Sequence, residues 1–355
     1  MYQPASEAGA ARLAQEWYES LDTKSKVGTR HHIVPRMILR RFANSAGQIR
    51  IRDRFTGKLR LVSVGDVAVK NFYTFVDLDM LPNGAMEIWL SEVEAEFARV
   101  ARPYLSSAAF GRAPALTGMD RFAVDTFVAV QALRGMRTRR SMELVADYSI
   151  KMVNQDKLSP AEIRDIEIVP HQNEHIEFMH RASEQLADHL SQRPVAVVRL
   201  DEKLLVISDE PVVLAPRDGV PKGDMRKRLR VDGERVPPAN LVQVASGLGV
   251  GFYDADEVIF PLSPRYALVY GEIHSLSSRP PTWDLQGREA IRVAREVNRL
   301  QARNAFSWVA AHPDGPHLAQ IPWPAATPAV IIYDDYSAPA AVVNAHPHAR
   351  PHRSN

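Results

Sequence analysis

The sequence predicts an α+β fold, in which a mostly helical N-terminal part with a small hairpin precedes a mainly antiparallel sheet and a long C-terminal helix. Three observations support this. Apolar residues recur at helical spacing to about residue 192, short valine-rich segments bounded by Gly, Pro or Asp fill residues 193–280, and helical spacing returns at residues 285–311. Because helices precede strands instead of alternating with them, a doubly wound parallel sheet is disfavoured.

The chain has 355 residues, enough for one large domain or two ordinary ones. With 45% hydrophobic and 24% charged residues, its composition is that of a globular protein. We expect an N-terminal helix and connector at residues 1–29 and a single domain at residues 30–335. Residues 336–355 cannot build a core and are expected to form a disordered tail.

The first elements of the predicted domain are short. A helix is expected after Pro35, because proline has no N–H to leave unpaired in a first helical turn, and residues 44–47 end it. Residues 48–54 and 58–64 alternate apolar and basic side chains, which predicts a hairpin.

Longer helices follow. Residues 87–105 and 120–152 each carry an apolar stripe, and Gly135 is expected to weaken the second helix by about 1 kcal/mol relative to Ala. Ser159-Pro160 is typical of a helix start, and residues 170–191 form a further amphipathic helix.

The predicted sheet is built from six short segments: residues 195–200, 203–208, 211–215, 241–245, 257–262 and 265–270. A polar loop rich in Pro and Gly, residues 216–238, lies between the third and the fourth. The last helix then extends to residue 311.

Composition excludes several kinds of chemistry. The absence of cysteine rules out disulfides, thiolate nucleophiles and cysteine metal sites. No apolar run approaches the roughly 20 residues that span a bilayer, and the N-terminus lacks the pattern of a secretory signal. We therefore expect a cytoplasmic protein without a membrane partner, and leave its oligomeric state open. A net charge of +2 does not by itself indicate a binding partner.

The distribution of charge is more informative. Residues 24–60 contain eleven Lys and Arg against one acid, Asp53. Such a field attracts phosphates, so nucleic acid or another polyanion is a candidate partner. The alternative is a solvated hairpin face whose arginines pair with the acidic residues of the helix at residues 87–96.

The segment from His31 to Arg36, followed by Leu39-Arg40 and Phe42, resembles the start of a widespread bacterial family of unassigned function. Its members open with H-[HY]-[IV]-P-[RQ], two or three residues, and L-[RK]-x-[FW]. Later blocks of the family match Asn71-Phe72-Tyr73, Gln131 with Arg134 and Arg137, Ser208-Asp209-Glu210-Pro211-Val212, Pro261 to Pro264, and Val297-Asn298. The resemblance covers roughly residues 30 to 310. It implies a shared fold and a shared polar site, but supplies no reaction.

The adjacent histidines just before the predicted helix are the most specific candidate functional residues in the sequence. Imidazole changes its charge near neutral pH and is the commonest metal ligand, so His31 and His32 are candidate catalytic groups. The block also resembles the first His of an HNH-type nuclease. Such a site needs an Asn and a second His nearby; Asn71 is present, but the next His is His171, which disfavours it. A purely structural role for the pair is the alternative.

Three further motifs carry candidate residues. Arg134 and Arg137 share a helix face with Gln131 and are expected to clamp a phosphate, unless these arginines and the following Arg139 and Arg140 pair with acids inside the fold. Asp209, after Ser208 at a strand end, is held rigidly by Pro211, as suits a metal ligand or general base; a turn Asp that accepts backbone hydrogen bonds is the alternative.

The third motif is weaker. His171 to His175 matches H-x-x-E-H, the inverted zinc-protease signature, with Glu174 between them and Glu257 or Asp254 as the third ligand. Twelve histidines produce such a spacing by chance, so a zinc peptidase is a distant hypothesis.

These residues define two functional hypotheses. The first is a hydrolase of phosphodiesters or phosphate esters that acts on nucleic acid, in phage defence or nucleic-acid turnover. It uses His31, His32 and Asp209 in catalysis, with His32 and Asp209 as candidate ligands of a divalent metal. The rival is a non-catalytic protein that binds nucleic acid or an anionic partner. The binding residues would be Arg36, Arg40, Asn71, Gln131, Arg134, Arg137 and Ser208.

Overall fold

The computed structural model describes residues 30–343 with gaps. The residues that it does not describe are 1–29, 68, 71–73, 77–81, 112–114, 155, 158, 160–161, 163–165, 217–229, 232–233, 236–242, 247–250, 253–254, 272–281, 325–329, 334–340 and 344–355. The expected helix at the N-terminus, Asn71, most of the polar loop at residues 216–238 and most of the expected tail therefore lie outside the description.

A five-stranded sheet forms the centre of the molecule. Its order is β15-β7-β14-β13-β9, and every pair is antiparallel except β15 with β7. The strands are β7 (Val195–Leu200), β9 (Val213–Pro216), β13 (Ala255–Ser263), β14 (Tyr266–Tyr270) and β15 (Thr282–Leu285). The predicted α+β class is confirmed.

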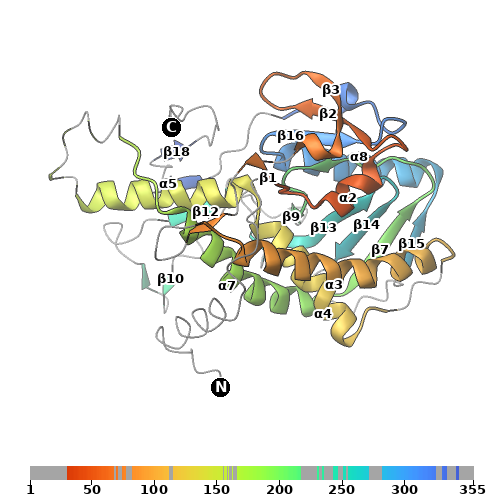
Figure 1. The fold of residues 1–355 in the computed structure, drawn as a ribbon, viewed down its shortest axis with the longest axis horizontal. Helices are drawn as coiled ribbons and strands as arrows, with labels where there is room; N and C mark the ends of the chain where they lie inside the picture. Colours follow the sequence, from red (N-terminus) through yellow and green to blue (C-terminus); the bar gives the residue numbers. More distant parts are fainter. Residues whose placement is uncertain are drawn as a thin grey trace.

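Helices cover both faces of this sheet (Figure 1). One face packs against α3 (Ala85–Ala108), α4 (Gly118–Leu133) and α7 (Gln172–Ser191), where Phe127 stacks on Phe97 at 3.8 Å between ring centroids. The other face packs against α8 (Gly287–Asn304) through Val198, Val269 and other small apolar side chains. The alternation of side chains along each strand feeds both cores.

A second sheet lies beside the first, with the order β3-β2-β16-β8. The predicted hairpin forms its edge as β2 (Gln48–Asp53) and β3 (Leu59–Ser63), and stands out at the top of Figure 1. Short helices precede and follow the hairpin: α2 (Arg36–Leu39), η1 (Arg40–Phe42) and η2 (Val64–Val67). The inner strands are β16 (Trp308–Ala311) and β8 (Ile207–Ser208).

The remaining described strands are short. They pair as β1 (Arg30–His31) with β4 (Val69–Lys70), β5 (Phe75–Val76) with β6 (Pro82–Asn83), β10 (Arg230–Val231) with β11 (Glu234–Arg235), and β12 (Gln243–Ser246) with β17 (Val330–Tyr333) and β18 (Ala341–Val343). Strand β18 lies within the region expected to be a disordered tail.

Two predicted boundaries were wrong. The helix expected at residues 120–152 is broken at Arg134-Gly135 into α4 and α5 (Met136–Val153), because Gly135 has an extended backbone with ψ 164°. The last helix ends at Asn304 rather than at residue 311, because residues 308–311 leave it to pair with β2. In the described part of the chain, no helix is long and apolar enough to cross a membrane.

Arg193 connects α7 to the central sheet. It is 2% exposed, and its guanidinium donates to the carbonyls of Phe252 (2.7 Å), Ala255 (2.9 Å) and Gly271 (2.8 Å). Replacing it by Met removes these donors while keeping much of the side-chain volume.

We expect Arg193→Met to lower the free energy of unfolding by about 3 kcal/mol, because buried carbonyls are left without donors. The control Arg199→Met removes a half-exposed ion pair with Asp284 (3.4 Å) and should cost less than about 1 kcal/mol. Urea denaturation of both variants measures the difference, and equal losses would contradict this role for Arg193.

Candidate functional site

The break between α4 and α5 brings together the segments that the sequence motifs marked. Arg134, 3% exposed, lies at the end of α4 and donates to the backbone carbonyl of His32 (2.5 Å) and to Glu94 of α3 (2.9 Å). The His-His segment is therefore attached to the end of α4 through the backbone carbonyl of His32.

The two imidazoles themselves point to different partners. His31 is buried, and its Nε2 lies 2.7 Å from Oε1 of Glu87 at the start of α3. His32 is half-buried, and its Nε2 lies 3.3 Å from the carbonyl oxygen of Val64 in η2. Both rings thus hold neighbouring elements together.

Asp209 is 1% exposed and follows β8 at the start of a turn. Its carboxylate accepts backbone N–H groups from Phe306 (2.8 Å) and Ser307 (2.6 Å), just after α8. Burial raises the pKa of this carboxyl above its ordinary value, against the lowering effect of those N–H donors and of Arg137. Asp209 therefore fixes the connection between α8 and β16.

Ser208 completes the same turn. Its hydroxyl lies 2.7 Å from Oε1 of Gln301 and 2.8 Å from the carbonyl oxygen of Glu210. Gln301 also accepts the N–H of Ser208 (2.9 Å) and donates to the carbonyl of Pro211 (2.7 Å). The polar side chains of α8 therefore hold the whole Ser-Asp-Glu-Pro segment.

Glu210 is the residue that sequence reasoning missed. It is 5% exposed and accepts the backbone N–H of Arg137 (2.7 Å), one of the N–H groups in the first turn of α5 that has no partner within the helix. Burial raises its pKa, the neighbouring Asp209 raises it further, and Arg137 opposes both effects. Its place in the Ser-Asp-Glu-Pro segment was the only signal, and that signal pointed to Asp209.

Arg137 lies between these carboxylates and α8. It is 9% exposed, donates to the carbonyl of Asn304 (3.0 Å), and interacts electrostatically with Glu210 and Asp209. Burial lowers the pKa of its guanidinium. We call Arg134, Arg137, Asp209 and Glu210 the polar cluster; it joins α4, α5 and the end of α8.

The other predicted binding residues are not part of the polar cluster. Gln131 is 1% exposed in α4, and neither atom of its amide group has a hydrogen-bond partner among the described residues. Arg36 and Arg40 are exposed on α2 and η1. The position of Asn71 is outside the described residues.

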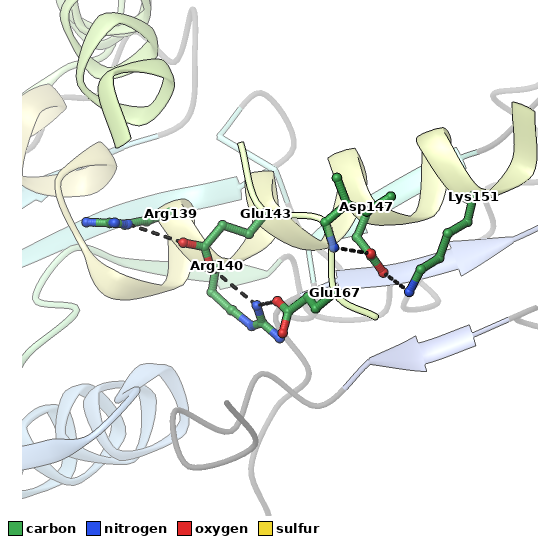
Figure 2. Close-up of polar contacts among 7 residues, drawn as sticks. Arg139, Arg140, Glu143, Asp147, Lys151 and Glu167 are labelled. Carbon is green, nitrogen blue, oxygen red and sulfur yellow. Dashed lines mark hydrogen bonds and ion pairs between the residues drawn. The ribbon is translucent and has the colours of Figure 1, made fainter. Parts of the chain in front are cut away.

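Arg139 and Arg140, which follow the predicted phosphate clamp, pair with acids inside the fold, as Figure 2 shows. Arg139 lies 3.3 Å from Glu143, and Arg140 contacts both Glu143 (3.2 Å) and Glu167. One turn further along α5, Asp147 pairs with Lys151 (2.9 Å) and accepts the N–H of Ile168 (2.7 Å). These contacts tie α5 to residues 167–168 and neutralise its arginines.

The two histidines of the H-x-x-E-H segment have structural roles at the start of α7. His171 is exposed and caps α7 by accepting the N–H of Asn173 (3.3 Å), whereas His175 is 3% exposed with its Nε2 3.3 Å from the carbonyl of Leu133. Burial lowers the pKa of His175 to about 4, which keeps it neutral. Among the described residues, no three His, Asp or Glu side chains are arranged as metal ligands.

Four exposed cations and the half-buried Arg50 occur instead along residues 36–60, which form α2, η1, β2 and the start of β3. We call Arg36, Arg40, Arg50, Lys58 and Arg60 the basic surface. Four of their charged groups form no ion pair with any residue that the structure describes, and Arg60 has one long contact with Asp53 (3.9 Å).

The acidic residues of α3 do not neutralise the basic surface. Arg52 and Arg54 of the same segment are also engaged elsewhere, since they donate to the carbonyls of residues 302, 318, 321 and 324. The acids of α3 pair elsewhere: Glu87 with His31, Glu94 with Arg134, and Glu96 with Arg99. The pairing that the sequence offered as an alternative is therefore absent from the described residues.

Residues 30–315 match a family described as protein of unknown function, DUF4238. The chain belongs to this family. Neither the curated proteins nor the solved structures gave a match. The matched span includes both the polar cluster and the basic surface, and agrees with the extent of the resemblance found in the sequence motifs.

Gly135 is required by the polar cluster, because a Cβ there would collide with the carboxyl group of Glu210. We expect Gly135→Ala to lower the free energy of unfolding by about 1–3 kcal/mol, the usual cost of overpacking. Gly65→Ala is the control, since its Cβ would meet only Ser63 at 3.8 Å. Thermal denaturation compares the two, and a fully stable Gly135→Ala variant would refute the close packing.

Glu210 should make stability depend on pH. Its pKa is raised in the folded state, so the folded chain binds more protons than the unfolded chain above pH 4.5, the ordinary value. Stability contributed by the protonated form is complete below that pH and is lost as the pH rises through the folded-state pKa of about 8.

We expect Glu210→Gln, which mimics the protonated acid, to flatten this decline by roughly 1.4 kcal/mol for each unit of pKa shift. Urea denaturation across the acidic to neutral range measures it, with the exposed Glu92→Gln of α3 as control. An unchanged pH profile in Glu210→Gln would show that Glu210 titrates normally.

Proposed function

We propose that this protein binds nucleic acid through its basic surface, without hydrolysing it. The proposal rests on a charge imbalance within residues 36–60. The five cationic side chains of the basic surface have one carboxylate contact among them, between Arg60 and Asp53 at 3.9 Å. Arginines and lysines that lack internal partners are available to phosphates, and each phosphate contact releases counterions from the nucleic acid.

The surroundings of these cations favour nucleic acid over a small anion. Leu59 and Leu61 of β3, 42% and 52% exposed, lie on the same face of the hairpin as Arg50, which pairs with Leu61, whereas Arg60 pairs with Ile51 on the other face. An extended hairpin that presents cations and apolar side chains together offers contacts to phosphates and to sugars or bases over a length of several residues. A free phosphate would need only one or two of these groups.

Binding without hydrolysis is favoured because the candidate catalytic groups are already engaged. His31 bonds Glu87, His32 lies against a carbonyl, and Asp209 accepts backbone N–H groups while 1% exposed. A general base must reach the proton that it abstracts, and a metal ligand must direct a free lone pair at the ion. The contacts of the polar cluster therefore favour a role in holding the fold together over a role in catalysis.

The test is fluorescence anisotropy with a labelled oligonucleotide at several salt concentrations. We expect Arg36→Gln/Arg40→Gln/Lys58→Gln to weaken binding at least tenfold and to reduce the slope of log K against log salt by about three. The control Arg102→Gln/Arg181→Gln/Arg265→Gln removes as much charge from exposed positions elsewhere. The binding proposal fails if the wild type does not bind, or if both variants lose the same affinity.

A further inference from the structure

We infer that a groove beside α8 is a track for single-stranded nucleic acid. This inference rests on the proposed function and names the form of nucleic acid that the protein takes. The groove has a volume of about 1720 Å³, larger than the 300–1,000 Å³ typical of small-molecule sites, and so suits an extended ligand.

The groove exists because α8 covers only part of its side of the central sheet. Residues at the start of β7 and at the end of β14, such as Ala196 and Val269, line its floor together with Ala215 of β9. The half-buried Trp283 of β15 and Ile291 of α8, 41% exposed, add larger apolar surfaces. Ala196 and Val269 are only 8% exposed, so the apolar surface offered to the flat faces of bases comes from Trp283, Ile291 and Ala215.

Four exposed arginines of α8 line the outer rim of the groove: Arg288, Arg292, Arg295 and Arg299. They lie on the side of α8 away from Ala290, Ala294 and Val297, which pack on the sheet. The spacing of the arginines, four, three and four residues, places them on one face of the helix, along a row of about 16 Å at 1.5 Å per residue. Arg299 pairs with Glu296 (2.5 Å), while the other three guanidinium groups have no ion-pair partner among the described residues. They form a row of available phosphate contacts.

Three acids also line the groove: Asp256 and Glu257 at the start of β13, and Glu296 of α8, which pairs with Arg299. Carboxylates repel phosphates, so a nucleic-acid strand in the groove would place its backbone against α8 and direct its bases toward the sheet. The arginines of α8 and the acids of β13 together therefore give the bound strand a defined orientation, which a uniformly basic surface would not.

The groove continues toward the basic surface. Pro316, His317, Gln320, Ile321 and Pro322 also line the groove, and Trp323 follows directly. The guanidinium of Arg52 lies 4.7 Å from the centroid of the Trp323 ring and that of Arg54 lies 5.4 Å away, so the hairpin fixes this segment. A strand leaving the groove would meet the β2–β3 hairpin next.

A single strand fits this arrangement better than a duplex. A duplex presents phosphates outward and keeps its base faces stacked inside, so an apolar floor beneath an arginine row would remain unused. In a single strand the base faces are accessible, and they match Trp283 and the aliphatic floor.

The test compares a labelled single-stranded oligonucleotide with its duplex form, using the full chain. We expect Arg288→Gln/Arg292→Gln/Arg295→Gln to weaken single-strand binding at least tenfold and to leave duplex binding within about twofold. Trp283→Leu should weaken single-strand binding roughly tenfold through lost stacking. Unchanged melting temperatures verify that the variants fold, and Arg102→Gln/Arg181→Gln/Arg265→Gln is the charge-matched control.

Each result decides the inference. Selective loss of single-strand binding supports it. Single-strand binding that survives the α8 substitutions but is lost with Arg36→Gln/Arg40→Gln/Lys58→Gln overturns the groove and leaves the proposed function intact. Equal losses for single strand and duplex, or a loss as large in the control, also overturn it. A wild type that binds neither probe overturns both the groove and the proposed function.

Discussion

The contact between Glu210 and the first turn of α5 is the constraint on which the rest of the structure depends. A buried carboxylate requires hydrogen-bond donors and an opposite charge, and Glu210 finds both in the backbone and side chain of Arg137. Its carboxyl group occupies the space beside Gly135, where α4 ends and α5 begins. That break turns α5 away from the central sheet, while Arg137 and Asp209 tie the same point to the end of α8.

This arrangement explains why the motif residues converge without forming an open site. Arg134 attaches the His-His segment through a backbone carbonyl, and the polar side chains of α8 hold the Ser-Asp-Glu-Pro turn. The cluster therefore connects the helical part, the hairpin sheet and α8. The charges that remain available lie on the basic surface and on the outer face of α8, which are the places where a partner can be bound.

The sequence pattern predicted those helices and strands that depend on residues close together in the chain. Alternation located the β2–β3 hairpin, and helical periodicity located α3 and α7. The break at Gly135 was not predictable, because the carboxylate that fills its space lies 75 residues further along the chain. Likewise residues 308–311 continue a helical pattern, and only pairing with β2 makes them a strand. At the site, the histidines and Asp209 were found as polar signals, but their hydrogen-bond partners are tertiary neighbours that sequence spacing does not show.

In the proposed binding mode, nucleic acid contacts the basic surface and the arginines of α8, and not the polar cluster. Photo-crosslinking of a single-stranded oligonucleotide to the wild-type protein, followed by mass spectrometry of the linked peptides, tests this most directly. This binding mode predicts crosslinks within residues 36–60, 283–299 and 316–323. Crosslinks concentrated at residues 131–137 and 208–210 would contradict it, because they would show a ligand reaching the cluster that we interpret as structural.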